Sequence, residues 1–205
     1  MIAIVDYGSG NIKAITNIYE RLRIPVCVVD TPQGLRKADK LILPGVGAFD
    51  DSMARLNASG LRQALDCQVL ENGVPILGVC VGMQIMACSS EEGIEEGLGW
   101  FDSSRVVRFD ESTIPLKPKL PHMGWNSARS QHHHPIFEGV DEEKGFYFLH
   151  SFHFICKPNH RLALTHYGAE FVSAVRNNQI FGFQFHPEKS HANGINIFKN
   201  FAGLC

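Results

Sequence analysis

The first half of the chain alternates between short, mainly apolar runs and longer stretches in which apolar residues recur every three or four positions. The runs have the length of buried strands, and the longer stretches have the spacing of one helix face. Strands that alternate with helices indicate βαβ units with right-handed crossovers, and a parallel sheet covered on both faces. Asn11 and Thr31 are the expected caps of the first two helices. The predicted strands are Ile2 to Asp6, Val26 to Val29, Lys40 to Leu43 and Val74 to Leu77, and the predicted helices are Ile12 to Leu22, a short one at Pro32, and Phe49 to Leu70 with a break at Ser59-Gly60.

The second half of the chain has a different pattern, with apolar and aromatic runs that predict further strands. Asn177-Asn178 lies between the last two runs and has the form of a hairpin turn. We therefore expect this half to add antiparallel strands to the parallel sheet. The chain closes with a predicted helix from His191 to Phe201, whose apolar stripe is Ile195, Phe198 and Phe201 despite Gly194. The predicted strands are Leu98 to Phe109, Phe146 to Ile155, Leu162 to Tyr167, Phe171 to Val175 and Ile180 to Phe185.

Composition narrows the class of protein. With 205 residues and 44% hydrophobic content, the chain is expected to form one domain over residues 1–205. A net charge of −2 without a basic cluster argues against nucleic-acid binding, and no apolar run reaches the length of a membrane span. The opening MIAIVDYG lacks the features of a secretion signal. The six cysteines are scattered without paired spacings, so we expect neither a disulfide framework nor a zinc site. Free cysteines fit a protein that works in the reducing cytoplasm.

The stretch from Val74 to Gln84 reads VPILGVCVGMQ and carries the strongest sign of chemistry. A strand leads into a turn with Cys80 at its apex and glycines on both sides, which is the form of a nucleophile elbow with Cys in place of Ser. A helix is expected to follow through Met86, so that its positive end favours the thiolate of Cys80. Taken alone, the stretch is equally consistent with a buried Cys at a strand–helix junction.

A thiol nucleophile needs a base and a group that orients the base. His186 follows the strand that ends at Phe185, and Pro187 stops the strand pairing because it has no N–H. In an extended segment Glu188 would face the same side as His186, so that its carboxylate could fix the imidazole tautomer. The other histidines are weaker candidates. His132 to His134 occupy a polar loop in which metal binding is a remote alternative, and His150 and His153 are expected to be core or rim residues.

Acyl chemistry also needs donors for an oxyanion. In an elbow, the N–H of Val81 is one such donor. The second is expected from the glycine-rich loop Pro44-Gly45-Val46-Gly47, where the backbone can approach a substrate or change orientation. An ordinary Gly-Pro turn explains that loop equally well on its own.

Taken together, the motifs resemble the class I glutamine amidotransferases, and within that class the glutaminase subunits of imidazole glycerol phosphate synthases. The resemblance covers almost the whole chain, and it implies a three-layer, flavodoxin-like α/β fold with a central, mostly parallel sheet, and no cofactor or metal. The motifs that carry it are LPGVGAF (Leu43 to Phe49), GVCVGMQ (Gly78 to Gln84), PHMGWN (Pro121 to Asn126), FYFLHS (Phe146 to Ser151) and FQFHPEKS (Phe183 to Ser190).

The resemblance assigns roles to individual residues. It implies that Cys80 attacks the carboxamide of glutamine, that His186 acts as general base and acid, and that Glu188 orients it. A glutamyl thioester would form and ammonia would leave. The residues that would hold the glutamine are Gln84, Glu92, Ser151 and Phe152, and the oxyanion hole would be formed at Val81 and Gly47.

The resemblance also implies a partner and a form of control. The partner is a cyclase with a (β/α)8-barrel fold that makes imidazole glycerol phosphate and an aminoimidazole carboxamide ribotide in histidine biosynthesis. When the partner's site is occupied, a backbone change near Gly47 would complete the oxyanion hole. The residues expected to face the partner are Trp125, Asn126, Tyr147 and Lys189.

Three other functions stay open at this stage. One is a paralogous glutaminase that supplies ammonia to a synthase of sugar or surface-polysaccharide biosynthesis, for which the segments GLGWFDSSRVVRF and NGINIFKNFAGLC leave room. Another is a stand-alone cysteine hydrolase or peptidase, but that function would leave the PHMGWN motif unexplained. The third is a non-catalytic subunit, which would usually have lost one of Cys80, His186 or Glu188.

Overall fold

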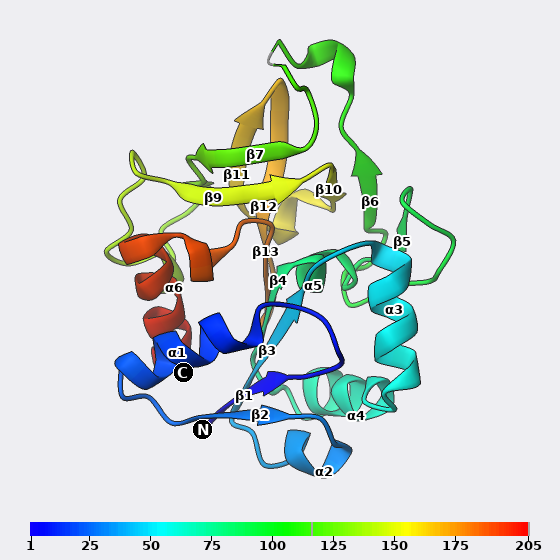
Figure 1. The fold of residues 1–205 in the computed structure, drawn as a ribbon, viewed down its shortest axis with the longest axis vertical. Helices are drawn as coiled ribbons and strands as arrows, with labels where there is room; N and C mark the ends of the chain where they lie inside the picture. Colours follow the sequence, from blue (N-terminus) through cyan, green and yellow to red (C-terminus); the bar gives the residue numbers. More distant parts are fainter. Residues whose placement is uncertain (116, 205) are drawn as a thin grey trace.

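Four strands from the first half of the chain lie side by side in the central sheet (Figure 1). The computed structural model describes residues 1–115 and 117–204. These strands lie in the order β2-β1-β3-β4, and every neighbouring pair is parallel, as the sequence predicts. Their carboxyl ends therefore meet at one edge of the sheet. The strands are β1 (Ile2–Val5), β2 (Val26–Val29), β3 (Lys40–Gly45) and β4 (Ile76–Cys80).

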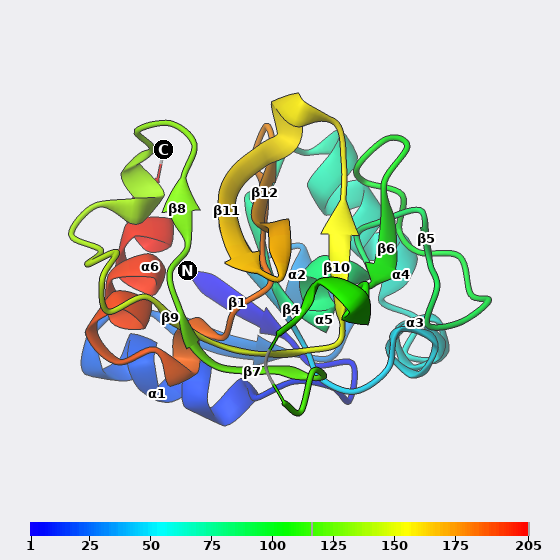
Figure 2. The same ribbon diagram turned by 90° about the horizontal axis from the view of Figure 1, so that it is seen from above.

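Helices cover both faces of this sheet, with α1 and α6 on one side and α2, α3 and α4 on the other (Figures 1 and 2). Thr31 caps α2 as expected, since its hydroxyl accepts the N–H of Gly34 at 3.3 Å. Asn11 precedes α1 but makes no capping hydrogen bond, so that prediction is wrong. The helices are α1 (Ile12–Arg21), α2 (Pro32–Leu35), α3 (Phe49–Ala58), α4 (Arg62–Asp66, continued by a π-helical turn over Cys67–Glu71), α5 (Val81–Gln84) and α6 (His191–Gly203).

The second half of the chain extends the sheet beyond β4. Strand β13 lies parallel to β4, and β12, β10, β6 and β5 follow in that order. The pairs β13–β12, β12–β10 and β10–β6 are antiparallel. Asn178 adopts the left-handed conformation expected of a hairpin turn, with φ of 53°. The strands are β5 (Ser89–Ser90), β6 (Arg105–Arg108), β8 (Arg129–Ser130), β10 (Phe152–Ile155), β11 (Arg161–Tyr167), β12 (Ala169–Asn177) and β13 (Ile180–Phe183), with β11 beside β12 and β8.

A separate two-stranded ribbon crosses the carboxyl edge of the sheet (Figure 1). It consists of β7 (His122–Asn126) and β9 (Phe146–His150), paired antiparallel. The prediction of one strand from Phe146 to Ile155 is therefore wrong. The chain leaves the ribbon at Ser151, whose carbonyl accepts the N–H of Phe109, and continues in the main sheet as β10.

Two further predictions need correction. The strand predicted from Leu98 to Phe109 is reduced to β6, because the N–H groups of Leu98 and Trp100 donate to carbonyls at Ile85 and Met86, just after α5. In α6, Ile195 is exposed, and the buried face instead consists of Asn193, Gly194, Ile197, Phe198 and Phe201.

Aromatic rings join the ribbon to the sheet. Phe146 in β9 stacks on Phe185 with ring centroids 4.0 Å apart, and Phe185 stacks on Phe183 at 4.9 Å. All three side chains are fully buried. Because buried aromatic side chains dominate core energetics, this stack fixes the ribbon over the end of β13.

Cys27, Cys67, Cys80, Cys88 and Cys156 are free thiols, while Cys205 lies outside the described residues. Within the described ranges, no helix is both long and apolar enough to cross a membrane.

The helix α6 approaches the chain after β13 unusually closely at Gly194, where an added Cβ would lie 1.7 Å from the carbonyl oxygen of Pro187. We expect Gly194→Ala to lower the free energy of unfolding by about 1–3 kcal/mol through overpacking. The matched control is Gly203→Ala in the same helix, because nothing lies within 4 Å of its Cβ position. Urea titrations of both variants measure the difference, and equal stabilities would contradict the close-packing argument.

Candidate active site

The turn at the end of β4 holds Cys80 in a strained conformation. Its φ is 55° and its ψ is −112°, which is a left-handed φ that side chains disfavour. This is the backbone expected of a nucleophile elbow. The helix that follows is shorter than predicted: α5 is one turn, and it ends at Gln84 rather than near Met86. A single turn has little macrodipole, so α5 favours negative charge at Cys80 less than a longer helix would.

His186 and Glu188 lie beside this thiol because β13 runs parallel to β4, with Phe183 opposite Val79. The Nδ1 atom of His186 is 2.9 Å from Oε1 of Glu188, and both side chains are almost fully buried. The predicted pairing is therefore present, although its local geometry differs. Pro187–Lys189 form a 3-10 turn, so Glu188 reaches the imidazole by folding back rather than along an extended segment.

The charge state of His186 follows from its two neighbours. Burial alone would lower the pKa of His186, but its contacts with Cys80 and Glu188 outweigh burial and raise that pKa to about 10. An imidazolium at neutral pH can give its proton to a leaving group. The arrangement thus holds a nucleophile, a proton carrier and an orienting carboxylate in contact, which suits acyl transfer.

A pocket of about 330 Å³ opens over the Cys80 thiol. Its lining contains most of the residues that the sequence nominates, although they come from several distant segments. The predicted site residues among its walls are Gly47, Cys80, Val81, Gln84, Glu92, Ser151, Phe152, His186 and Lys189, and Val46, Arg108, Pro121, Leu149 and His150 complete the lining.

The loop after β3 forms one wall of this pocket. Gly47 has a φ of 93°, a conformation that favours glycine. The backbone of the preceding residue is fastened to Ser9, because the N–H of Val46 donates to the Ser9 hydroxyl at 3.1 Å and that hydroxyl donates to the Val46 carbonyl at 3.0 Å. Tyr7 also donates to the carbonyl of Pro44 at 2.8 Å. Two side chains therefore hold the loop in its observed orientation.

A pair of glutamine side chains connects the opposite wall to the nucleophile. Nε2 of Gln84 donates to the carbonyl of Phe152 at 3.1 Å and to Oε1 of Gln184 at 3.0 Å. Nε2 of Gln184 lies 3.8 Å from the sulfur of Cys80. Sequence reasoning missed Gln184, which lies two residues before His186. The alternation of strand side chains would have placed it on the same face.

Glu92 is the acidic residue at the far end of the pocket. Its Oε2 accepts the N–H of Phe49 at 2.8 Å, which is the first residue of α3. The N-terminus of a helix favours negative charge, so this contact holds the carboxylate at the pocket wall.

The outer face of the ribbon carries two of the four residues expected to face a partner, Trp125 and Tyr147, and a third, Lys189, lies beside it in the turn after β13. The rings of Trp125 and Tyr147 contact edge to face at 6.5 Å, and Nζ of Lys189 lies 5.6 Å from the centre of the Tyr147 ring. Met123 and Leu149 extend this exposed face and were missed by sequence reasoning. Although half of Trp125 is exposed, its ring also stacks on His191 at 5.2 Å.

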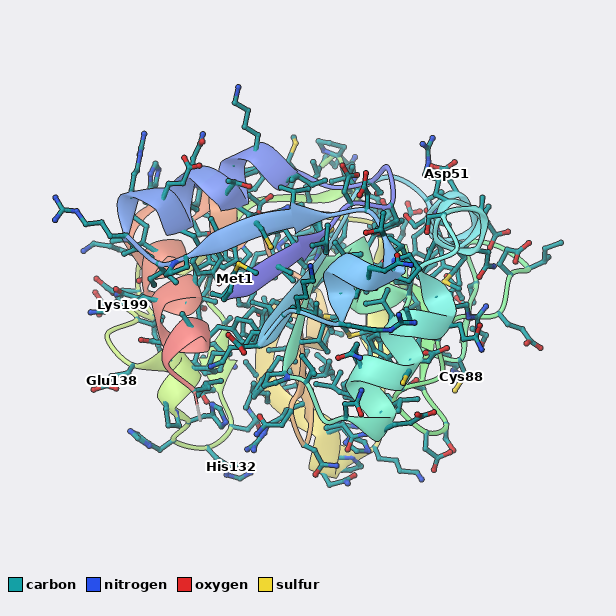
Figure 3. The ribbon with its side chains drawn as sticks, turned by 90° about the horizontal axis from the view of Figure 1, so that it is seen from below. Met1, Asp51, Cys88, His132, Glu138 and Lys199 are labelled. Atoms are coloured by element: carbon teal, nitrogen blue, oxygen red, sulfur yellow. The ribbon has the colours of Figure 1, made fainter. Side chains whose placement is uncertain are left out.

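Asn126 lies elsewhere. Its side chain is on the inner face of the ribbon, where Nδ2 donates to the carbonyl of His166 at 3.0 Å and lies 3.2 Å from Nε2 of His122. His132 projects from the outer edge of the molecule (Figure 3). Among the described residues, no group of three or more His, Cys, Asp or Glu side chains is arranged to hold a metal ion.

Comparison with known proteins extends this picture. The model of the family "Glutamine amidotransferase class-I" matches residues 3–203. Imidazole glycerol phosphate synthase subunit HisH of Bdellovibrio bacteriovorus is 51% identical over 207 residues, with 100% of both chains covered. Imidazole glycerol phosphate synthase subunit HisH 2 of Pseudomonas aeruginosa is 45% identical over 207 residues, again with 100% of both covered.

Solved structures share the fold at lower identity. A crystal structure of a glutamine amidotransferase superposes with a TM-score of 0.73 at 19% identity and covers 100% of both chains. The structure of PurLQS from Thermotoga maritima gives 0.66 at 17% identity, covering 98% of this chain and 97% of the other. The chain therefore belongs to the class-I glutamine amidotransferase family, and within it to the HisH subunits of imidazole glycerol phosphate synthase.

Proposed function

We propose that this enzyme hydrolyses glutamine to glutamate and ammonia, and passes the ammonia to a separate cyclase subunit in histidine biosynthesis. The observation that carries the proposal is the contact of His186 with both Cys80 and Glu188 inside a pocket large enough for an amino acid. The relatives named as imidazole glycerol phosphate synthase subunits support the choice of pathway. We place the reaction in the cytoplasm, where a free thiol nucleophile stays reduced.

The proposed reaction begins when the Cys80 thiolate attacks the side-chain carbonyl carbon of glutamine. A C–S bond forms, and the carbonyl π electrons move to oxygen. As the tetrahedral intermediate collapses, the C–N bond breaks and the imidazolium of His186 gives its proton to the departing nitrogen, which leaves as ammonia. His186 then removes a proton from water, which attacks the thioester. Glutamate is released, and the proton returns to the Cys80–His186 pair.

Two backbone donors are proposed for the oxyanion. The N–H of Val81 is one, by the geometry of an elbow. The loop over Pro44–Gly47 would supply the other, but the Ser9 hydroxyl holds the N–H of Val46. We propose that this loop changes orientation when the partner's site is occupied, so that hydrolysis proceeds when ammonia can be used.

The outer face of the ribbon is the proposed docking surface for a (β/α)8-barrel cyclase. It presents Met123, Trp125, Tyr147 and Leu149 beside Lys189 and the mouth of the pocket. Exposed aromatic and apolar side chains gathered on one face mark interaction sites, and Trp and Tyr are the usual anchors. Ammonia released at Cys80 would then have a short route to the partner.

Replacing the nucleophile separates glutamine hydrolysis from use of ammonia. In the complex with the cyclase, we expect Cys80→Ala to lower glutamine-dependent product formation by at least about a thousandfold, because no thioester can form. With ammonium salt supplied, the same variant is expected to match the wild-type rate. Glu188→Gln should cost about ten- to a hundredfold, since Glu188 orients rather than reacts. The control is Cys88→Ala, an exposed cysteine outside the pocket. Glutamine-dependent turnover by Cys80→Ala would disprove the mechanism.

The raised pKa of His186 predicts a pH dependence of stability. A histidine whose folded pKa lies above its unfolded value near 6.5 stabilises the folded state fully below that value. This contribution is lost as pH rises through about 10. Glu188→Gln removes one of the two contacts that raise the pKa, so we expect the stability gap between wild type and variant to narrow from pH 6.5 to pH 10. Urea titrations at pH 6, 8 and 10 measure it, and a gap that widens with pH would reverse the assigned sign.

The physiological partner can be identified because it should increase the rate of glutamine hydrolysis. We expect the histidine-pathway cyclase with its bound nucleotide ligand to raise glutamine hydrolysis, and Trp125→Ala to weaken the complex by about tenfold or more, as loss of an aromatic anchor does. His132→Ala, outside the ribbon, serves as the control. Hydrolysis assays with the cyclase, and with synthases of sugar or surface-polysaccharide biosynthesis, decide between pathways. An unchanged rate with the cyclase would reject the histidine pathway.

A further inference from the structure

Two histidines meet across the inner face of the ribbon, and one of them, His150, lines the glutamine pocket. His122 in β7 is paired with His150 in β9, and Nδ1 of His122 lies 3.0 Å from Nε2 of His150. Nδ1 of His150 lies 2.8 Å from the carbonyl oxygen of Phe152. That oxygen also accepts the side-chain amide of Gln84. The pair therefore ends on a carbonyl at the pocket wall.

The carbonyl fixes the tautomer of both rings. A carbonyl oxygen only accepts, so Nδ1 of His150 must carry the hydrogen. In a neutral ring its Nε2 then has a lone pair, which accepts the Nδ1–H of His122. His122 is in turn left with an acceptor at Nε2. All the hydrogen bonds thus point in one direction, toward Phe152.

The hydrogen bonds of Asn126, beside His122 at the other end of this series, have the same direction. The Asn126 side chain is fixed by two backbone groups: its Oδ1 accepts the N–H of Ser127 at 2.9 Å, and its Nδ2 donates to the carbonyl of His166 at 3.0 Å. The second hydrogen on Nδ2 faces Nε2 of His122 at 3.2 Å. A proton added to His122 at Nε2 would meet this donor, so an imidazolium does not fit.

The surroundings also favour neutral rings. Burial lowers the pKa of His122 to about 4, and burial together with the neighbouring His122 lowers the pKa of His150 well below its usual value. The titratable groups that face the pair are Tyr167, on which His122 stacks at 4.0 Å, and His153 and His186, which act on His150. The remaining rings packed on the pair are apolar: Phe109, Phe148 and Phe171.

We propose that His122 and His150 are positioning residues that act as a neutral, one-directional hydrogen-bond relay and hold the Phe152 carbonyl at the glutamine pocket. One end of the relay is Asn126, which lies in β7 next to Trp125. The other end is the Phe152 carbonyl at the pocket wall, which also accepts a hydrogen bond from Gln84. It orders the binding site and takes no part in proton transfer. The inference rests on the proposed glutaminase function, since the Phe152 backbone is expected to hold glutamine.

The tautomers can be measured without any activity. In the full chain labelled with ¹⁵N at histidine, long-range ¹H–¹⁵N correlation spectra are expected to show both rings neutral and protonated at Nδ1 from pH 5.5 to pH 8. An Nε2–H tautomer on either ring, or a charged ring at pH 6, would overturn the relay. This outcome is independent of whether the protein hydrolyses glutamine, so failure of the relay and failure of the proposed function are distinguishable.

Kinetics test the positioning role. His122→Phe keeps a ring to stack on Tyr167 and Phe148 but removes the donor to His150. We expect the KM for glutamine to rise about five- to tenfold, the effect of one buried hydrogen bond, while kcat changes less than about twofold because the triad is untouched. The matched control is His153→Phe, whose ring packs on the same Phe109 at 4.7 Å outside the relay. An unchanged KM in His122→Phe, or an equal rise in the control, would overturn the positioning role. If His122→Phe does not fold, the tautomers measured in the wild-type protein still test whether the relay exists.

Discussion

The left-handed backbone at Cys80 is the constraint on which the rest of the site depends. Such a conformation costs about 1–3 kcal/mol and persists only where the surrounding packing enforces it. Two glycines supply that packing. A Cβ on Gly82 would lie 1.9 Å from the carbonyl oxygen of Leu43, and a Cβ on Gly45 would lie 2.3 Å from the nitrogen of Gly82. Strands β3 and β4 and the single turn of α5 are therefore in backbone contact, and the thiol projects beyond the carboxyl edge of the sheet.

Cys80, His186 and Glu188 meet because the direction of strand pairing changes at one place in the sheet. Strand β13 is parallel to β4 and antiparallel to β12, so it carries the end of the antiparallel half of the chain to the edge where Cys80 stands. A strand in the opposite direction would deliver His186 to the other edge. The ribbon closes the same edge, since the N–H of His186 donates to the carbonyl of Tyr147 and the Ser190 hydroxyl accepts the N–H of Tyr147. Base and ribbon are thus held as one unit.

The parallel half of the fold and the meeting of Cys80, His186 and Glu188 could be predicted from the sequence, because apolar runs, glycines and the His-Pro-Glu motif are local signals. The antiparallel half could not be predicted in detail. The segment 146–155 is rich in aromatic and apolar residues on both sides of His150 and Ser151. Its division at Ser151 depends on β7 and β6, which lie far away in the sequence. Gln184 was not singled out, and the hydrogen bonds of Asn126 on the inner face of the ribbon were not anticipated, for a related reason. Their positions follow from which face of a strand is covered, and the covering elements come from distant segments. Residues inferred through the family resemblance nevertheless line one pocket, since each lies at a strand end on the same edge.

The ribbon reverses the usual distribution of side chains on a surface hairpin. Its inner face holds the polar rings of His122 and His150, and its outer face exposes Met123 and Trp125. Exposed apolar residues and buried polar ones are the informative departures in a folded protein. Burying two histidines costs free energy unless every nitrogen has a hydrogen-bonding neighbour, and here the carbonyl of Phe152 and the amide of Asn126 complete that set. Apolar side chains on the inner face would pack as well but would leave the Phe152 carbonyl without one of its two donors. The polar inner face is therefore better explained by the proposed glutamine pocket than by stability, and the apolar outer face by the proposed docking surface.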